Sequence, residues 1–137
     1  MIKTDTENTL NEIDKIHLLS SEAIEQKQFD DYINIFSEKL TYKQFNGKII
    51  DKKQLTKDTI VYFSRLKTLK SKYERKNYSI EGNRFTENLI QQATVSITVF
   101  FFFTKKWTIE REGTYEWNKT EGNWKIEKVE ILKEKVY

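Results

Sequence analysis

The sequence predicts an α+β domain in which three N-terminal helices pack inside a strongly bent, mainly antiparallel sheet. In the first half of the chain, apolar residues recur at three- and four-residue steps, which is typical of amphipathic helices. In the second half they alternate with a period of two, and turn-forming residues divide this half into four long strands that no proline interrupts. The predicted order is helix, helix, strand, strand, helix and four strands, with the sheet curling around the helices.

The N-terminal region predicts two helices. Apolar residues from Leu10 to Ile24 lie on one face of a helix predicted over 8–28. Asp30 and Asp31 then offer negative charge to the N-terminus of a second, short helix. Its apolar residues keep helical spacing: Phe29, Tyr32, Ile33 and Phe36.

A hairpin and a third helix follow. The period changes to two over 40–50, and Asn46-Gly47 predicts a type I′ turn in which both residues adopt positive φ. Asp51, with Gln54 three residues later, has the pattern of an N-cap and capping box. The third helix is predicted to continue to about Leu66.

The rest of the chain predicts four antiparallel strands. Their ranges are 71–84, 89–104, 107–118 and 123–134. The predicted turns are Gly82-Asn83 or 86–88, then 104–106, then 120–123. In the last strand Trp124 and Ile126 share a phase that Val129 and Ile131 do not, so we expect a bulge near Glu127 and Lys128.

Four consecutive phenylalanines, Phe100 to Phe103, make both faces of the predicted strand apolar at one end. We expect Phe101 and Phe103 to face the helices. The other two side chains would then lie on the opposite face, where a second copy of the chain would cover them. This predicts a homodimer through the sheet face, and a reversed assignment of the two faces leaves the prediction unchanged.

Length and composition predict one domain and exclude several classes of site. A chain of 137 residues lies in the single-domain range, so we expect a frayed N-terminus over 1–7 and one domain over 8–137. The absence of cysteine excludes disulfides, thiolate metal ligands and cysteine nucleophiles. Since only one histidine is present, a transition-metal site would depend on carboxylates, and we expect no metal and no cofactor.

The N-terminal residues are polar and acidic, whereas a signal peptide needs a basic start and an apolar run. No stretch approaches the roughly 20 apolar residues of a membrane span. We therefore expect a cytoplasmic protein without a membrane partner.

Two segments carry a resemblance to a known superfamily, namely AIEQKQFDDYINIFSEKLTYKQFNGKIIDKKQL and EGTYEWNKTEGNWKIEKVEIL. Their order of short helix, hairpin, capped helix and Trp-initiated last strand resembles the nuclear transport factor 2-like superfamily, which includes SnoaL-like and ketosteroid isomerase-like proteins. The resemblance extends over 8–132 and implies a cone-shaped half barrel. It also places the isomerase's tyrosine, base and neutral acid at Ser20, Gln44 and Gly113. Since none of these keeps the required chemistry, steroid isomerisation is rejected.

His17 is the only histidine and lies within or beside the apolar stripe of the first helix. A histidine on a cavity wall can act as a general acid or base, because its pKa lies near cellular pH. The alternative is a hydrogen-bonded packing residue. Both interpretations remain open on the sequence alone.

Arg111 shares the apolar face of its predicted strand with Tyr115 and Trp117. An inward arginine must be paired or must lie in a wet cavity, because burying it alone is costly. It would anchor an anionic or carbonyl ligand, or it would form an ion pair with a glutamate of a neighbouring strand or a cation-π contact. The sequence favours the ion pair or cation-π contact.

The basic segment 65–78 contains six basic residues and one acidic residue, with Tyr73 and Tyr78 between them. Basic groups beside aromatic rings can hold single-stranded nucleic acid. Alternation in a strand, however, spreads these charges over two faces, and lysine also protects strand edges. We do not expect nucleic-acid binding.

Two functions follow from these observations. The first is a SnoaL-like protein that binds a small molecule, with His17 as a possible catalytic proton shuttle in a lyase or isomerase reaction on a small apolar carbonyl compound. The resemblance and the strand phases together predict the residues that line its pocket: His17, Ser20, Tyr32, Tyr42, Gln44, Arg111, Tyr115 and Trp117. The second is a non-catalytic association module whose cone is filled by the 19 aromatic side chains. The sequence leaves open whether the protein is an enzyme.

Overall fold

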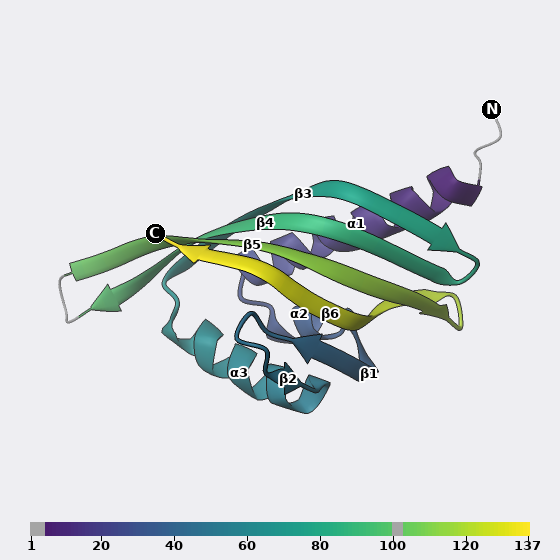
Figure 1. Cartoon of the computed structure of the whole chain (residues 1–137). Coiled ribbons are helices and arrows are strands. Elements are labelled where there is room, and N and C mark those ends of the chain that lie inside the picture. Colours follow the sequence, from purple (N-terminus) through teal and green to yellow (C-terminus); the bar gives the residue numbers. More distant parts are fainter. Residues whose placement is uncertain (1–4, 100–102) are drawn as a thin grey trace.

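A computed structural model describes residues 5–99 and 103–137 of the chain. It shows one strongly curved sheet over three helices (Figure 1). The elements follow the predicted order: α1 Asp5–Glu25, α2 Phe29–Ile33, β1 Phe36–Lys43, β2 Ile49–Ile50, α3 Lys52–Arg65, β3 Thr68–Glu81, β4 Arg84–Val99, β5 Phe103–Thr120 and β6 Asn123–Val136. The strand order is β2-β1-β6-β5-β4-β3. Only the β1–β6 pairing is parallel among these neighbours. The predicted α+β class with a bent, mainly antiparallel sheet is confirmed.

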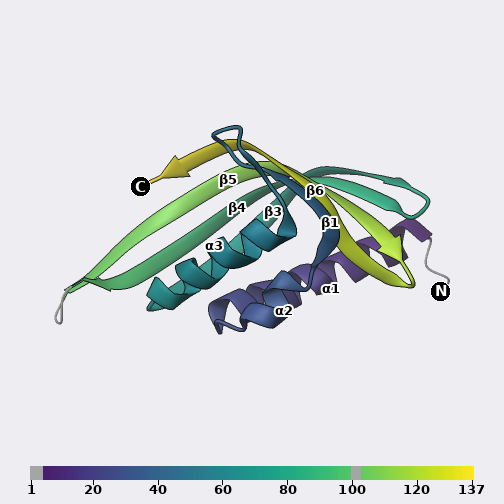
Figure 2. The same ribbon diagram turned by 90° about the horizontal axis from the view of Figure 1, so that it is seen from below.

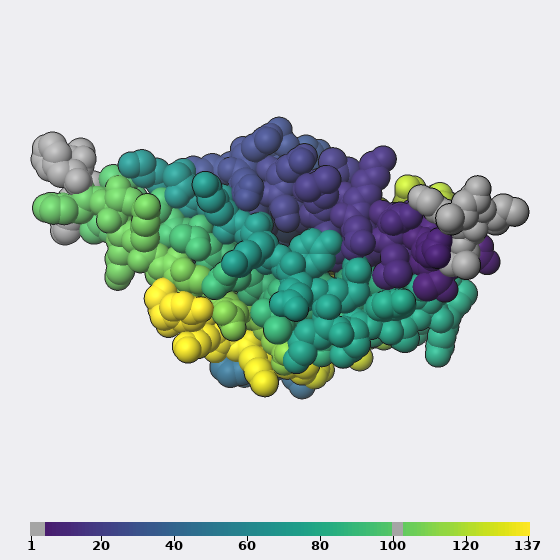
Figure 3. Space-filling model, turned by 90° about the horizontal axis from the view of Figure 1, so that it is seen from above, coloured from purple at the N-terminus to yellow at the C-terminus, as the bar shows by residue number. Residues whose placement is uncertain are grey.

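The three helices cover the concave face of the sheet. Seen from below, α1, α2 and α3 lie together along one side of the long strands (Figure 2). Helix α1 packs along β3, and the two lie side by side in the space-filling view (Figure 3). The sheet remains open, so the space between its concave face and the helices can reach solvent.

Two apolar clusters join the helices to the sheet. The larger cluster includes Ile13 of α1 and Phe36 of β1, packed with Phe85, Leu89 and Trp117 of the long strands. The smaller cluster lies near the end of α3 and contains Phe63, Leu66, Leu69 and Val95. Since these groups belong to different elements, their burial holds the helices against the sheet.

Helix α1 begins three residues before its predicted start and ends three residues before its predicted end. It spans Asp5–Glu25 rather than 8–28, so 5–7 are helical rather than frayed. The chain then turns through Lys27, which has a positive φ of 57°. In α3, Ile60 and Val61 are about half exposed, while Thr59 and Phe63 are buried.

The first hairpin forms, but its turn differs from the prediction. Gly47 donates its N–H to the carbonyl of Gln44 over 2.9 Å, and the N–H of Gln44 bonds to the carbonyl of Lys48 over 2.8 Å. Only Gly47 of the Asn46-Gly47 pair has a positive φ, at 86°. The loop therefore has three residues with glycine in the left-handed position, not the two-residue type I′ geometry.

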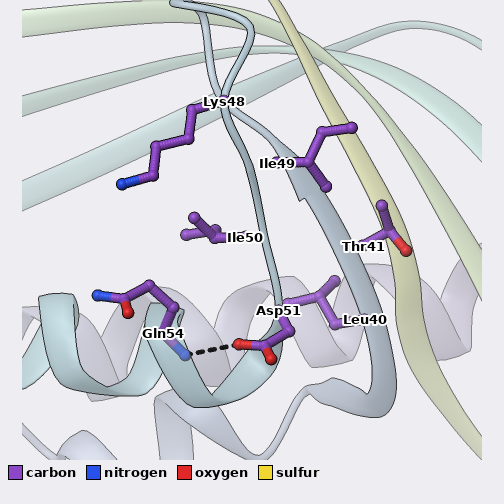
Figure 4. A pocket seen from close by; sticks show the side chains of 7 residues that line it. All are labelled: Leu40, Thr41, Lys48, Ile49, Ile50, Asp51 and Gln54. Atoms are coloured by element: carbon purple, nitrogen blue, oxygen red, sulfur yellow. Dashed lines mark hydrogen bonds between the residues drawn. The ribbon is translucent and has the colours of Figure 1, made fainter.

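The predicted N-cap of α3 is confirmed. The Asp51 carboxylate accepts a hydrogen bond from the backbone N–H of Gln54 over 2.8 Å (Figure 4). The Gln54 side chain donates to Asp58 over 2.9 Å and does not return to the cap. The cap thus forms without the second half of the predicted capping box.

The strand boundaries decide between the two alternatives for one predicted turn and correct another. Glu81 pairs with Arg84, so the turn lies at Gly82-Asn83 and 86–88 belong to β4. The predicted turn at 104–106 is wrong, because these residues belong to β5. Val99 pairs with Phe103, so the chain reverses between these two residues. A run of large side chains without glycine gives no sequence signal for that reversal.

Phe103, the last residue of the phenylalanine run, therefore does not continue β4. Phe103 begins β5 and is 68% exposed, which contradicts its predicted position facing the helices. Phe100, Phe101 and Phe102 lie outside the described residues. Their predicted faces, and the dimer contact inferred from them, stay predictions.

The predicted bulge in the last strand is confirmed. Trp117 pairs with Ile126 and Glu116 pairs with Lys128, which leaves Glu127 as the extra residue. A second bulge leaves Leu132 unpaired opposite the Glu112-Gly113 step. Two bulges in one strand increase its bend and twist, which helps to curve the sheet over the helices.

Within the described part of the chain, no helix is both long and apolar enough to cross a membrane.

Candidate functional site

A cavity of about 570 Å³ lies between the concave face of the sheet and the helices. Side chains from α1, α2, α3 and all strands except β2 line it. Its walls are mostly apolar, and two groups of interacting polar side chains contribute to them. One is centred on His17, and the other on Arg111.

At the first place, His17 forms a buried pair with Glu87. The Nε2 of His17 lies 2.8 Å from Oε2 of Glu87. The Glu87 side chain is fully buried, although His17 still lines the cavity. Trp117 donates its indole N–H to the same carboxylate oxygen over 2.7 Å. Helix α1 and strands β4 and β5 each contribute one of these three residues.

Arg75 completes the coordination of the Glu87 carboxylate. Its Nε donates to Oε1 of Glu87 over 2.9 Å, and its terminal nitrogen donates to Asp14 over 2.7 Å. Burial alone would lower the pKa of Arg75, but the hydrogen bonds to Asp14 and Glu87 outweigh that effect and raise it. Arg75 therefore stays charged and balances the buried carboxylate.

Aromatic rings on two sides hold the His17 ring. The Tyr73 ring lies 4.4 Å away between centroids, and the Trp117 ring meets it edge-on at 5.4 Å. The Tyr73 hydroxyl donates to Asp14 over 3.2 Å. Burial, then the nearby Asp14 carboxylate, raises the pKa of Tyr73 to about 12. The imidazole is thus fixed in orientation while one side stays open to the cavity.

At the second place, Arg111 lies among tyrosines. Tyr32, Tyr42 and Tyr115 line the cavity and are close enough to affect its pKa. Burial would lower the pKa of Arg111, but Tyr42 and then Glu134 act against burial, and the net pKa is raised. The Nε of Arg111 lies 3.4 Å from Oε2 of Glu134. This is the ion pair with a neighbouring strand that the sequence favoured.

Burial raises the pKa of all three tyrosines. It is the main cause in Tyr115, whose hydroxyl donates to Gln91 over 2.6 Å. In Tyr32 and Tyr42 burial is likewise the main cause, and the positive charge of Arg111 opposes it. The hydroxyls therefore remain hydrogen-bond donors across the range of pH in which proteins usually work.

The structure brings seven of the eight predicted pocket residues to one cavity: His17, Ser20, Tyr32, Tyr42, Gln44, Arg111 and Tyr115. Trp117 is not among the lining residues, because it is fully buried behind His17 with its indole directed at Glu87. Gly113, the other position taken from the resemblance, is also absent from the lining. What these residues bind stays a prediction.

Sequence reasoning missed Glu87, Arg75 and Asp14. Glu87 was assigned to a possible turn over 86–88, although Phe85, Glu87 and Leu89 alternate as one inward strand face. With the turn placed at Gly82-Asn83, all three residues would have fallen in one predicted strand, and Glu87 would have been recognised as inward-facing. Arg75 was treated only as part of a basic run. No sequence signal links it to Asp14, 61 positions earlier in the chain.

A second depression of about 440 Å³ lies on the surface beside β1, β2 and α3 (Figure 4). Among its seven lining residues, Asp51 is already engaged as the cap of α3. The other polar side chains that line the depression are those of Thr41, Lys48 and Gln54 (Figure 4). It holds no acid–base pair, so the interior cavity is the candidate site. Across the described residues, no group of three His, Asp or Glu side chains is placed to hold a metal ion.

The sequence matches neither of the two sets with which it was compared. No protein-family model matches the chain, and no curated protein matches it.

Solved structures, by contrast, match nearly the whole fold. A candidate scytalone dehydratase from Novosphingobium aromaticivorans superposes with a TM-score of 0.85 at 9% identity, covering 96% of this chain and 88% of that one. A hexachlorocyclohexane dehydrochlorinase, LinA type 2, gives 0.74 at 9% identity, with 97% and 91% covered. A candidate dehydratase of the NTF2-like family from Streptomyces avermitilis gives 0.73 at 7% identity, with 91% and 96% covered. The chain therefore has the nuclear transport factor 2-like fold, as the resemblance implied.

Proposed function

We propose that the protein binds a small, largely apolar carbonyl compound in the interior cavity and that His17 transfers a proton in a lyase or isomerase reaction. The observation that carries the proposal is a buried His17–Glu87 pair on the wall of an open cavity. The proteins of similar fold include a dehydrochlorinase and candidate dehydratases, which fits elimination chemistry in such a cavity.

The cavity also distinguishes this function from the alternative of a non-catalytic module. That alternative requires the aromatic side chains to fill the cone. An unfilled volume of about 570 Å³ supports a bound small molecule instead.

The hydrogen bonds around Glu87 define the role of each nitrogen of His17. An ionised carboxylate accepts all three contacts, from Arg75, Trp117 and His17. Nε2 of His17 must then carry the proton and donate it. In the neutral imidazole, Nδ1 then keeps its lone pair and is the atom that accepts a proton from a substrate.

In the proposed step, Nδ1 takes a proton from the carbon next to the substrate's carbonyl group. The electron pair of the broken C–H bond forms the C=C bond of an enolate and moves the carbonyl π electrons to the oxygen, to which the Gln44 amide can donate. The Glu87 carboxylate stabilises the imidazolium that forms. Return of the proton to another carbon gives isomerisation, and loss of a leaving group gives elimination.

The test uses 2-acetylnaphthalene, an apolar ketone with exchangeable methyl protons. We expect the protein to accelerate exchange of these protons with deuterated water, measured by NMR. His17→Gln should slow the enzyme-dependent exchange by about 100- to 10,000-fold. Leu19→Ala, on the exposed face of the same helix, serves as the control. An exchange rate unaffected by His17→Gln would refute the proton-transfer role.

A further inference from the structure

We infer that Arg111, Tyr32 and Tyr42 form a subsite for the carboxylate group of the molecule in the cavity. The inference rests on the proposed function, because it assumes that the cavity holds a small molecule. It adds the substrate class: an apolar carbonyl compound that also carries one carboxylate.

The guanidinium of Arg111 has unused donors. Its Nε is buried and forms no hydrogen bond, since the nearby Glu134 oxygen at 3.4 Å does not meet hydrogen-bond geometry. Within the described part of the chain, no side-chain hydrogen bond uses its terminal nitrogens. Glu134 thus stands beside the Nε edge, and the two terminal NH₂ groups remain for a ligand. A carboxylate matches this planar pair of donors in a bidentate way.

Two tyrosine hydroxyls supply further donors. Tyr115 is engaged with Gln91, which fixes it as a wall of the site. For Tyr32 and Tyr42, no hydrogen-bond partner of the hydroxyl exists in the described residues, although both line the cavity. Burial keeps both phenols protonated, so each can donate to an anionic oxygen.

The charges in the cavity argue against a dianion. Besides Arg111 and Glu134, the ionised residues that line it are Lys72 and Asp58, which are of opposite sign. A single guanidinium already beside one carboxylate cannot balance the two charges of a phosphate monoester. A carboxylate brings one charge and needs fewer donors.

The remaining walls determine the body of the ligand. The apolar side chains that line the cavity include Ile35, Phe36, Ile109, Ile126 and Ile131. These surfaces suit a flat, apolar skeleton whose carboxylate lies against Arg111 while its carbonyl group approaches His17.

The experiment compares 6-acetyl-2-naphthoate with the corresponding amide and measures both dissociation constants by fluorescence. The wild-type protein should bind the acid about 10- to 100-fold more tightly than the amide. Arg111→Met should abolish this difference, and Arg111→Lys should restore part of it. Tyr42→Phe should reduce the difference less than Arg111→Met does. The matched control is Arg65→Met, an exposed arginine at the end of α3.

A second readout needs no substitution at the site. In wild-type protein labelled with ¹⁵N, the Arg111 Nε–H resonance should shift when the acid is added and stay unchanged with the amide. Equal affinities for acid and amide in the wild-type protein, or a preference that survives in folded Arg111→Met, would overturn the subsite.

The two proposals can fail separately. If His17→Gln abolishes exchange but the acid preference does not depend on Arg111, the subsite is wrong and the proton-transfer role stands. If the preference depends on Arg111 and no exchange depends on His17, the subsite stands without that role.

Discussion

Glu87 is the residue that joins the chemistry of the site to the stability of the fold. Its buried carboxylate holds Arg75, His17 and Trp117, which come from three different elements. A buried carboxylate of this kind is stable only while its partners remain, because an unpaired charge in the interior is very costly. The same contacts that orient His17 therefore also tie α1 to the sheet.

Removing that carboxylate should destabilise the protein strongly. We expect Glu87→Ala to lower the free energy of unfolding by about 3–5 kcal/mol, because it leaves Arg75 and the Trp117 N–H without their buried acceptor. Glu116→Ala removes a partly exposed carboxylate 3.7 Å from Lys128 and should cost about 1 kcal/mol or less. Urea unfolding measures both. Equal effects of the two substitutions would contradict the role of Glu87.

The buried tyrosines predict how stability depends on pH. The pKa is raised in five tyrosines of the folded protein, in each case mainly by burial: Tyr32, Tyr42, Tyr62, Tyr73 and Tyr115. In the unfolded chain they lose protons near pH 10. Since the folded state holds these protons more tightly, the stability they contribute is complete below about pH 10 and is lost as pH rises through the folded-state values.

Phenolate absorbance provides the measurement. In the native protein it should lag behind that of the chain in denaturant as pH rises above about 10, and the delayed tyrosines should ionise together with unfolding. Seven tyrosines that titrate together near the unfolded value, with no loss of fold, would show that these hydroxyls are not buried.

Individual residues differ in how far the sequence could predict them. His17 and Arg111 lie on regular helix and strand periods, so local phase alone placed them on inward faces. The partners of His17 depend on β3 and β4 packing against α1, which no local pattern contains. Glu87 was missed because the turn was left open between Gly82-Asn83 and 86–88. A charged residue on an inward phase is therefore better treated as a candidate site than as a turn.

The two bulges of β6 shape the sheet beside the site. Each bulge adds one unpaired residue to β6, namely Glu127 and Leu132. Because of this extra residue, apolar side chains before and after each bulge can point to the same face of the sheet. Next to the second bulge, Gly113 lets the backbones approach closely. A Cβ at this position would lie 3.0 Å from the carbonyl oxygen of Glu130 and 3.1 Å from a methyl group of Ile131.

Gly113→Ala tests this close approach by the sign of its effect. At an open strand position, alanine should stabilise relative to glycine, because glycine loses more conformational freedom on folding. At Gly113 we expect a loss of about 1–3 kcal/mol from overpacking, and a larger loss for Gly113→Val. Thermal unfolding measures the series. A gain in stability with alanine would contradict the packing at the bulge.

The boundaries of helices and strands were predicted correctly where the local sequence signal was strong. The Asp51 cap and the Glu127 bulge were predictable because one residue or one phase shift determines each. The reversal between Val99 and Phe103 carries no glycine, proline or asparagine, so a continuous strand was predicted across it. Tertiary pairing with β3 and β5 sets the end of β4, and such pairing has no local sequence signal.

The molecule as a whole presents different surfaces on the two sides of its sheet. The concave face lines the cavity. The convex face carries acidic and basic side chains in pairs, such as Glu112 with Lys76 at 2.7 Å and Glu116 with Lys128 at 3.7 Å. A surface with both charges can match a copy of itself related by a two-fold axis.

The homodimer through the sheet face remains a prediction from the sequence, and the charged pairs determine its expected behaviour. Sedimentation at micromolar concentration should give twice the mass of one chain. High salt, or Glu112→Lys together with Glu116→Lys, should shift the mass toward the monomer. A single-chain mass for the wild-type protein at low salt would contradict the dimer.

The fold was predictable because the spacing of apolar residues along the chain indicates the type and order of the helices and strands. A long antiparallel sheet that curves over three helices then forms the cone. The contents of the cone were not predictable to the same extent. Whether 19 aromatic side chains fill the interior or leave a cavity depends on packing between distant elements.

A crystal structure with 6-acetyl-2-naphthoate tests most directly whether one cavity joins the proton-transfer pair to the anion subsite. We expect the carboxylate to contact the terminal nitrogens of Arg111 and the hydroxyl of Tyr42, with the acetyl group within reach of His17 Nδ1. A compound bound only on the surface, or lying in the cavity with its carboxylate away from Arg111, would contradict this account.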